Sequence, residues 1–267
     1  MIYEAYTQKG KSLSAGTSLF GDVYVPPSPN DGGLSVGGIW AVTPPLASQS
    51  LQYLGFRLWD MQVLEDEAQR WGARSLAGLG GIEYLADLLA GELPPSKNTQ
   101  KDKPIVAIVR GRQEFGPRAL GHRSLVAVPD TNAMRDRMNR LKFRQWYRPV
   151  APLIAAEALE DVFGSVIKSP YMTMAPRVRE SVLERFPALA HIDGTARHQS
   201  VGEEDEPWIH ELLLAIGRRT GLAALINTSF NTKGKPIVNT VRECLTMLQE
   251  LKDLDYVLID DWLFAKT

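Results

Sequence analysis

Apolar runs alternate with amphipathic stretches along most of the chain after residue 80. Short apolar runs, most of them rich in β-branched residues, predict buried strands at 105–109, 124–128, 222–226, 256–259 and 262–266. Apolar residues at helical spacing predict helices at 80–91, 129–141, 155–163, 207–219 and 241–251. Strands that alternate with helices in this way are typical of an α/β fold.

Residues before 80 carry a weaker pattern. A short strand is predicted at 23–25, and the NDGGLSVGG turn after it leads into small residues that favour a helix. Asp31 suits a helix N-cap or a ligand at a helix N-terminus, and an ordinary turn aspartate is the alternative. The Pro- and Lys-rich stretch from Gly91 to Pro104 is the best linker. The expected domains are therefore 1–95 and 96–267.

Composition is that of an ordinary globular protein of 267 residues, 44% hydrophobic and 23% charged. A net charge of −1 argues against bulk attraction to nucleic acid or membranes. The one cysteine, Cys244, excludes a disulfide within the chain and lies in an amphipathic helical pattern, where we expect it to be packed. No apolar run of signal or membrane type is visible, which predicts a soluble cytoplasmic protein.

Charge is concentrated in one segment, from Arg110 to Arg148. It holds nine arginines and one lysine against three carboxylates, a net of +7 over 39 residues. Arginine suits bidentate capture of phosphate and carboxylate, so the segment indicates an anionic ligand. Structural ion pairs are the alternative. The arginines expected to be partly buried are Arg118, Arg123, Arg144 and Arg148. Those expected to be solvated helix surface are Arg135, Arg137 and Arg140.

The first cluster in this segment is the loop GRQEFGPRALGHRS. Its glycines, Gly111, Gly116 and Gly121, allow backbone to approach a ligand closely. Its arginines, Arg112, Arg118 and Arg123, supply positive charge. The loop lacks the GxxxxGK[ST] and GxGxxG patterns of common nucleotide sites. A turn in which Glu114 pairs with an arginine is the structural alternative.

A second cluster is LKFRQWYRP. Lys142 and Arg144 are two residues apart and share a face if this stretch is extended, so both would converge on one anion. Arg148 follows four residues later.

A third cluster is HIDGTARHQ, in which His191, Asp193 and Arg197 surround a glycine. A histidine–carboxylate pair is suited to acid–base work, and a hydrogen-bonded loop is the alternative.

A fourth cluster is NTSFNTKG, directly after the predicted strand 222–226. Ligands of α/β proteins bind beyond the carboxyl ends of strands. The small polar residues suited to bind ribose, base or phosphate there are Asn227, Thr228, Ser229 and Asn231.

The four clusters, RQEFGPRALGHRS, KFR with RPVAP, HIDGTARHQSV and INTSFNTKGKPIV, occur in an order that resembles the C-terminal part of the carbamoyltransferase family. That family includes the nodulation-factor and antibiotic O-carbamoyltransferases. The resemblance implies a YrdC/Sua-like twisted sheet with flanking helices at 96–267. It implies that 1–95 is a partial actin-like (carbamoyl-transfer) module with its connector, of the ATPase superfamily.

The resemblance also implies a reaction and its participants. Carbamoyl phosphate and ATP with Mg²⁺ would give carbamoyladenylate, and the carbamoyl group would pass to a hydroxyl-bearing small-molecule acceptor. Roles in catalysis are implied for Lys142, Arg144, His191 and Arg197. Roles in cofactor binding are implied for Arg118, Arg148, Asn227, Thr228, Ser229 and Asn231.

Asp31 matches a metal ligand of the family, and Fe²⁺ is expected only if the remainder of the N-terminal module is supplied. A partner chain or a homodimer would be one way to supply it, and nucleic acid and membranes are not expected as partners. The alternative functions are a threonylcarbamoyl-adenylate-type synthase and a non-catalytic module that binds a nucleotide or RNA.

Overall fold

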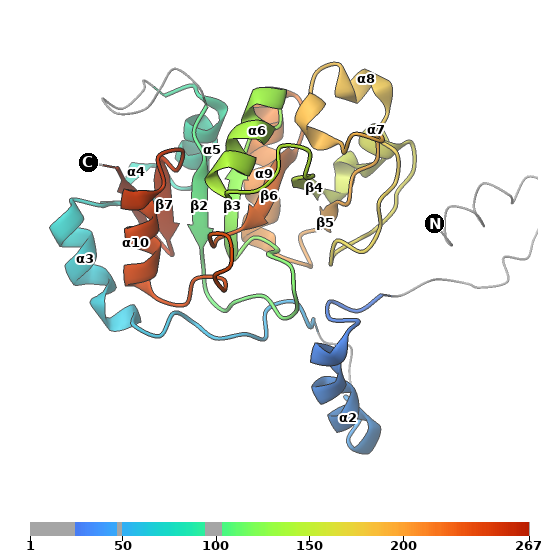
Figure 1. Cartoon of the computed structure of the whole chain (residues 1–267), viewed down its shortest axis with the longest axis horizontal. Helices are drawn as coiled ribbons and strands as arrows, with labels where there is room; N and C mark the ends of the chain where they lie inside the picture. Colours follow the sequence, from blue (N-terminus) through green and yellow to red (C-terminus); the bar gives the residue numbers. More distant parts are fainter. Residues whose placement is uncertain (1–24, 47–49, 94–102, 267) are drawn as a thin grey trace, which may run out of the picture.

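Eight short strands form one sheet at the centre of the computed structural model, which describes residues 25–46, 50–93 and 103–266 (Figure 1). In sheet order the strands are β1 (Arg74–Ser75), β8 (Trp262–Ala265), β7 (Tyr256–Ile259), β2 (Val106–Val109), β3 (Arg123–Ala127), β6 (Ala224–Ser229), β4 (Ala151–Ala155) and β5 (Gln199–Val201). Within the described chain, two strand pairs, β2–β7 and β4–β5, are parallel and the other pairs are antiparallel. The fold is therefore mixed α and β, with a mostly antiparallel sheet.

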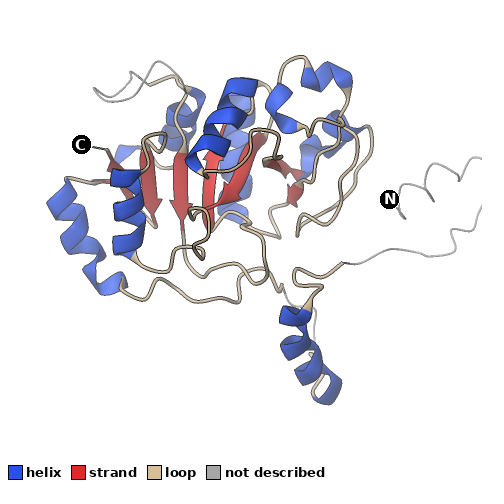
Figure 2. Ribbon diagram, in the orientation of Figure 1, coloured by secondary structure: helices blue, strands red, loops and turns tan. Residues whose placement is uncertain are grey.

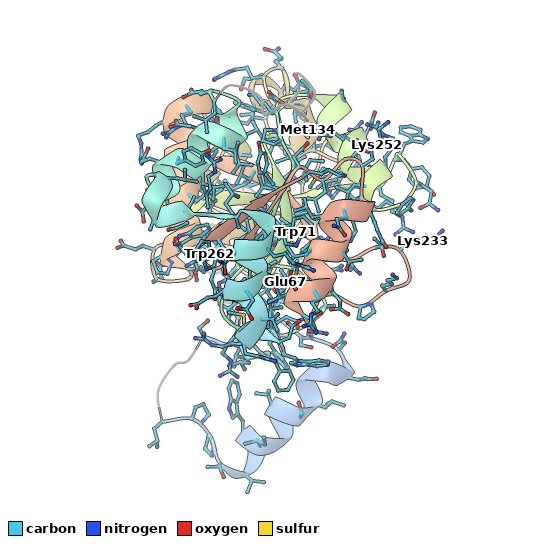
Figure 3. All side chains as sticks on the ribbon, turned by 90° about the vertical axis from the view of Figure 1, so that its left-hand side faces the viewer. Glu67, Trp71, Met134, Lys233, Lys252 and Trp262 are labelled. Carbon is cyan, nitrogen blue, oxygen red and sulfur yellow. The ribbon has the colours of Figure 1, made fainter. Side chains whose placement is uncertain are left out.

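Helices cover both faces of this sheet (Figure 2). The helices over one face are α3 (Leu64–Trp71), α6 (Asn132–Leu141) and α10 (Val241–Glu250). The helices over the other face are α4 (Leu76–Leu79), α5 (Ile82–Ala90) and α9 (Pro207–Thr220). Figure 3 shows α3 beside α10, with Trp71 lying against the sheet side, where its ring meets Phe264 edge-on at 6.3 Å. Each face therefore has its own apolar core.

Buried residues on these helices match the predicted core. Met134 and Met138 on α6 are buried, as expected from their helical spacing. Cys244 is fully buried on α10, and burial raises the pKa of its thiol far above the ordinary value. A buried thiol of this kind is a packing residue and is not a nucleophile.

A third core lies beyond β4 and β5. Its helices are η3 (Ala156–Ala158), α7 (Leu159–Phe163), α8 (Glu180–Leu183) and η4 (Pro187–Leu189). Its apolar residues pack under Ile154 of β4 and Ala224 of β6. This core supports the segment that carries His191 and Arg197.

The front of the described chain lies apart from the sheet (Figure 1). η1 (Asp31–Gly33) leads into α2 (Leu34–Val42), none of whose residues is buried. Asn30, and not Asp31, is the N-cap of η1, because its Oδ1 accepts the Gly32 N–H at 3.1 Å. Asp31 is therefore not the N-cap, which was one of the roles that the sequence left open for it beside that of an ordinary turn aspartate.

Most predicted elements occur within a few residues of their expected bounds, including the helix after the NDGG turn. The elements that escaped prediction include η2 (Met61–Val63), α3, β1, α4, α8 and η4. The predicted strand at 23–25 and most of the predicted linker fall on residues outside the described ranges. β1 and α5 join the same sheet and core as residues after 103, so elements on both sides of residue 95 pack together. The boundary between 1–95 and 96–267 stays a prediction.

Candidate functional site

Strand register brings the four sequence clusters to one edge of the sheet, the lower edge in Figure 1. Ser124, at the start of β3, lies opposite Ser229, at the end of β6. Ala151, at the start of β4, lies opposite Asn227 of β6, and β5 runs parallel to β4. The Gly-rich loop before β3, the turn before β4, the loop before β5 and the end of β6 therefore meet here. This convergence could not be predicted from the sequence, because the clusters span more than 100 residues of the chain.

Lys142 is the buried centre of this edge. Its Nζ donates to the carbonyl oxygens of Ser229 at 2.6 Å and Asn231 at 2.5 Å, and it also contacts Asn231 Oδ1. Ser229 Oγ lies 3.3 Å from the same Nζ and donates to Asn231 Oδ1 at 2.7 Å. The second and fourth clusters thus form one hydrogen-bonded unit. Burial, followed by repulsion from Arg144, lowers the pKa of Lys142 to about 7.

Arginines surround this unit and repel one another. Burial, then Arg148 and Arg197, lowers the pKa of Arg144 to about 10. Burial and then Arg118 lower the pKa of Arg197. Throughout the described ranges, Lys142 and these four arginines make no ion pair with a carboxylate. Uncompensated cations that gather in one place are costly without an anion between them, which makes this edge the candidate anion site.

Exposure divides these arginines into two pairs. Arg144 and Arg197 are half-buried, and Arg197 Nε is buried without a hydrogen-bond partner in the described chain. Arg118 and Arg148 are exposed, which corrects the expectation that they are partly buried. The half-buried pair is therefore less accessible to solvent than the exposed pair, of which Arg148 donates its Nε–H to Gln145 Oε1 at 2.8 Å.

The turn that carries Lys142 differs from the expected extended stretch. Phe143 has a φ of 49°, and the chain turns directly after α6, so Lys142 and Arg144 are not on one face of a strand. Asn139, which is buried on α6, organises this turn: its Oδ1 accepts from Arg144 Nε at 2.5 Å. Its Nδ2 donates to the carbonyl oxygens of Trp146 and Arg148, both at 2.9 Å. The sequence offered no signal for this role, because the turn is what brings these atoms to Asn139.

The Gly-rich loop is fixed from within by Glu114, whose side chain is buried. Glu114 Oε1 accepts from three backbone N–H groups, those of Leu120 (2.7 Å), His122 (2.8 Å) and Arg123 (3.1 Å). Asn227 Nδ2 donates to the Ala119 carbonyl at 2.8 Å and ties the loop to β6. Asn227 Oδ1 is buried without a hydrogen-bond partner in the described chain. Thr228 is half-buried in β6 beside it.

Two of the three loop arginines are structural. Arg123 is buried and donates to the carbonyls of Arg110 at 2.7 Å and Gly111 at 3.0 Å. Arg112 donates to the carbonyls of Gly55 and Leu54, both at 2.8 Å. Of the loop arginines, only Arg118 is left for the anion site.

The loop glycines serve packing within the protein. Gly116 has a φ of 106°, and a Cβ there would lie 2.5 Å from the Pro27 carbonyl oxygen. Gly121 has a φ of 115°, and a Cβ there would lie 3.0 Å from Ile209 on α9. A side chain at Gly116 would clash with the backbone of Pro27, and one at Gly121 would be strained by the positive φ and tight against Ile209.

His191 and Asp193 form a hydrogen-bonded loop, the alternative to an acid–base pair. Asp193 Oδ1 accepts from Thr195 Oγ1 at 2.7 Å, and Thr195 Oγ1 also lies 3.2 Å from His191 Nδ1. His191 Nε2 accepts the Arg197 backbone N–H at 3.4 Å, and burial lowers the pKa of the ring. His191 therefore places Arg197 in the structure, while its role in catalysis stays a prediction.

The spacing of Arg137 suggested that it is solvated helix surface, and the structure shows that it is not. It is buried and pairs with Asp255, with Nη2 and Oδ2 2.6 Å apart, and with Asp253 at 3.4 Å. This arginine is part of a structural ion pair and takes no part in the anion site.

Asp31 is exposed. Across the described ranges, no group of three or more His, Cys, Asp or Glu residues is arranged to hold a metal ion. The residues present therefore do not fit an iron site, and no chemistry is assigned to one. Within the same ranges, no helix is long and apolar enough to cross a membrane.

Known proteins provide three comparisons. The family model described as Carbamoyltransferase C-terminus matches residues 98–266. Nodulation protein NolO of Bradyrhizobium diazoefficiens is 33% identical over 270 residues, 97% of this chain and 47% of that protein. The 3'-hydroxymethylcephem-O-carbamoyltransferase of Amycolatopsis lactamdurans is 35% identical over 253 residues, 94% of this chain and 45% of that protein. The chain spans less than half of the length of either relative.

A solved structure of full-length HypF, in the phosphate- and nucleotide-bound form, aligns with 68% of this chain and 25% of its own. The sequence identity is 19% and the TM-score is 0.43.

Proposed function

Because the chain belongs to the carbamoyltransferase family, we propose that its anion site forms carbamoyladenylate from carbamoyl phosphate and ATP, for transfer of the carbamoyl group to a hydroxyl acceptor. One observation carries the proposal. A buried lysine joined to Ser229 and Asn231 lies among four arginines that have no carboxylate partner in the described chain.

The proposed chemistry balances in two steps. Water first cleaves carbamoyl phosphate to carbamate and phosphate. A carbamate oxygen then attacks the α-phosphorus of ATP, and pyrophosphate leaves with the electron pair of the broken P–O bond. Both steps concentrate negative charge on phosphoryl oxygens, so catalysis needs positioning and charge stabilisation more than it needs a nucleophile.

The residues of the site divide this work. Arg144 and Arg197, which are half-buried, would stabilise charge on the phosphate that reacts. Arg118 and Arg148, which are exposed, would capture the outer phosphates. Lys142, whose pKa is about 7, is held by Ser229 and Asn231 where a bound phosphate would keep it protonated.

Polar groups on β6 would bind the rest of the nucleotide. The Asn227 Oδ1, without a partner in the described chain, fits a hydroxyl or amino donor, and Thr228 is half-buried in the same strand. Mg²⁺ would arrive on the phosphates of ATP and lower their charge. In the same proposal, the sheet is of YrdC/Sua-like type, and the segment around α2 is the end of an actin-like carbamoyl-transfer module.

Exchange of label between pyrophosphate and ATP tests the proposal. We expect exchange that requires carbamoyl phosphate and Mg²⁺. Lys142→Ala should lower its rate by ~10²–10³-fold, the size of effect seen when one charge-stabilising donor is removed. Lys252→Ala, which changes an exposed lysine (Figure 3), is the matched control and should keep the full rate.

Absence of exchange by folded wild-type protein would refute the adenylation. Exchange with bicarbonate and threonine in place of carbamoyl phosphate would instead indicate the threonylcarbamoyl-adenylate reaction. Steeply salt-dependent RNA binding without turnover would indicate a binding module.

A further inference from the structure

The turn from Lys142 to Arg148 alternates cations with aromatic side chains. Its cations are Lys142, Arg144 and Arg148, and its aromatic residues are Phe143, Trp146 and Tyr147. The three aromatic residues remain 62%, 65% and 53% exposed, in that order. The cations belong to the anion site, while the proposed function gives the rings no role.

Asn139 ties the backbone of the aromatic segment to the Arg144 side chain. One Nδ2 group donates to the carbonyls of both Trp146 and Arg148, and the Oδ1 of the same amide accepts from Arg144 Nε. The backbone of Trp146 therefore lies within one amide group's reach of the Arg144 guanidinium. The segment that carries the exposed rings is thus fixed next to the residue proposed to bind the anion.

These three aromatic side chains do not pack into a hydrophobic core of the protein. Phe143 adopts a φ of 49°, a left-handed conformation that is uncommon for a bulky residue and occurs often at functional sites. Trp146 and Tyr147 meet edge-on, with ring centroids 6.0 Å apart and an interplanar angle of 83°. An edge-on pair leaves ring faces uncovered, and an uncovered ring face is a surface on which a flat ligand can stack.

We infer that Trp146 and Tyr147 form a stacking platform for the adenine base of the nucleotide whose phosphates lie on the arginines. This inference rests on the proposed function, because it requires a nucleotide in the anion site. Cations that bind the phosphates, next to aromatic rings that stack on the base, are the combination used to bind single nucleotides and single strands. The platform would make the site bind a nucleoside polyphosphate more tightly than inorganic polyphosphate.

Calorimetric titration of the full chain with MgATP and with Mg-tripolyphosphate, both without carbamoyl phosphate, tests the platform. Trp146→Ala should weaken ATP binding by ~5–150-fold, which corresponds to a stacking energy of about 1–3 kcal/mol. The same variant should leave tripolyphosphate binding within about twofold of wild type, because tripolyphosphate has no base. Tyr147→Ala should show the same selectivity with a smaller factor.

Trp59→Ala is the matched control, because Trp59 is 67% exposed and lies on a different segment, where its backbone N–H donates to the Asn239 carbonyl. This variant should bind both ligands as wild type does. The platform is refuted if Trp146→Ala and Tyr147→Ala both bind ATP normally, which would indicate rings that cover a protein interface. It is also refuted if either variant weakens ATP and tripolyphosphate by the same factor.

Failure of the platform is distinguishable from failure of the proposed function. Wild-type protein that binds ATP and tripolyphosphate equally, yet catalyses exchange, would refute the platform alone. A selective loss of ATP binding in Trp146→Ala, in a protein that catalyses no exchange, would support the platform and refute adenylation.

Discussion

Arg137 and Arg144 are seven residues apart and have opposite surroundings. Arg137 lies against Asp253 and Asp255 and donates to backbone carbonyls. Arg144 contacts the Asn139 amide and the Pro149 carbonyl, and the charges acting on it are those of Arg148 and Arg197. The two also differ in burial, because Arg137 is buried and Arg144 is half-buried, but this difference is the smaller one.

What separates them is the sign of the neighbouring charge. An arginine that is paired with carboxylates has its desolvation cost offset within the protein. The desolvation cost of an arginine among other cations is not offset until an anion binds. Binding of an anion is therefore favoured at such an arginine. The same distinction separates Arg123, which donates to four backbone carbonyls, from Arg197, whose Nε has no partner in the described chain.

The largest expected effect comes from breaking the paired arginine. Arg137→Met should lower the free energy of unfolding by ~3–5 kcal/mol, because it leaves the Asp255 carboxylate buried without its cation. Burial already raises the pKa of Asp255 despite the attraction of Arg137. Urea denaturation measures the loss. The double variant Arg137→Met/Asp255→Asn should recover part of it, and no recovery would contradict the ion-pair explanation.

Removal of the unpaired arginine should have the opposite pattern. Arg144→Ala should lower the rate of ATP–pyrophosphate exchange by ~10²–10³-fold. Its free energy of unfolding should change by less than about 1 kcal/mol, because relief from Arg148 and Arg197 offsets the lost hydrogen bond to Asn139. If Arg144→Ala loses stability and keeps its exchange rate, Arg144 is a structural arginine like Arg137 and the prediction is wrong.

A smaller effect is expected from the protonation of Lys142. Its pKa is about 7 in the folded protein against an ordinary value of 10.5, so between these values the unfolded chain binds a proton that the folded protein does not. The free energy of unfolding should therefore rise with pH in this window, by about 2 kcal/mol from about pH 7 to about pH 9 relative to Lys142→Met. Saturating pyrophosphate should remove this difference, because the bound anion keeps Lys142 charged. Identical pH dependence in both proteins would exclude a desolvated lysine.

Local chemistry in the sequence was sufficient for most of the strands and for most of the longer helices. The run 105–109 is apolar and β-branched, and α6 has Met134, Met138 and Leu141 at helical spacing, so both were predictable from their own residues. α3 was missed, although Leu64, Ala68 and Trp71 share one of its faces, because its other residues are polar. The prediction of a ligand at the end of β6 was likewise local, since it rested on four small polar residues after an apolar run.

The sequence by itself therefore determined the α/β class, most of the longer elements and the concentration of charge between Arg110 and Arg148. Only the tertiary structure decided which of these charges face carboxylates and which face one another. Asp255 lies 118 residues from Arg137, and Asn231 lies 89 residues from Lys142. Electrostatic energy depends on distance in space and on removal from water, and strand register, not position along the chain, sets both quantities at this edge of the sheet.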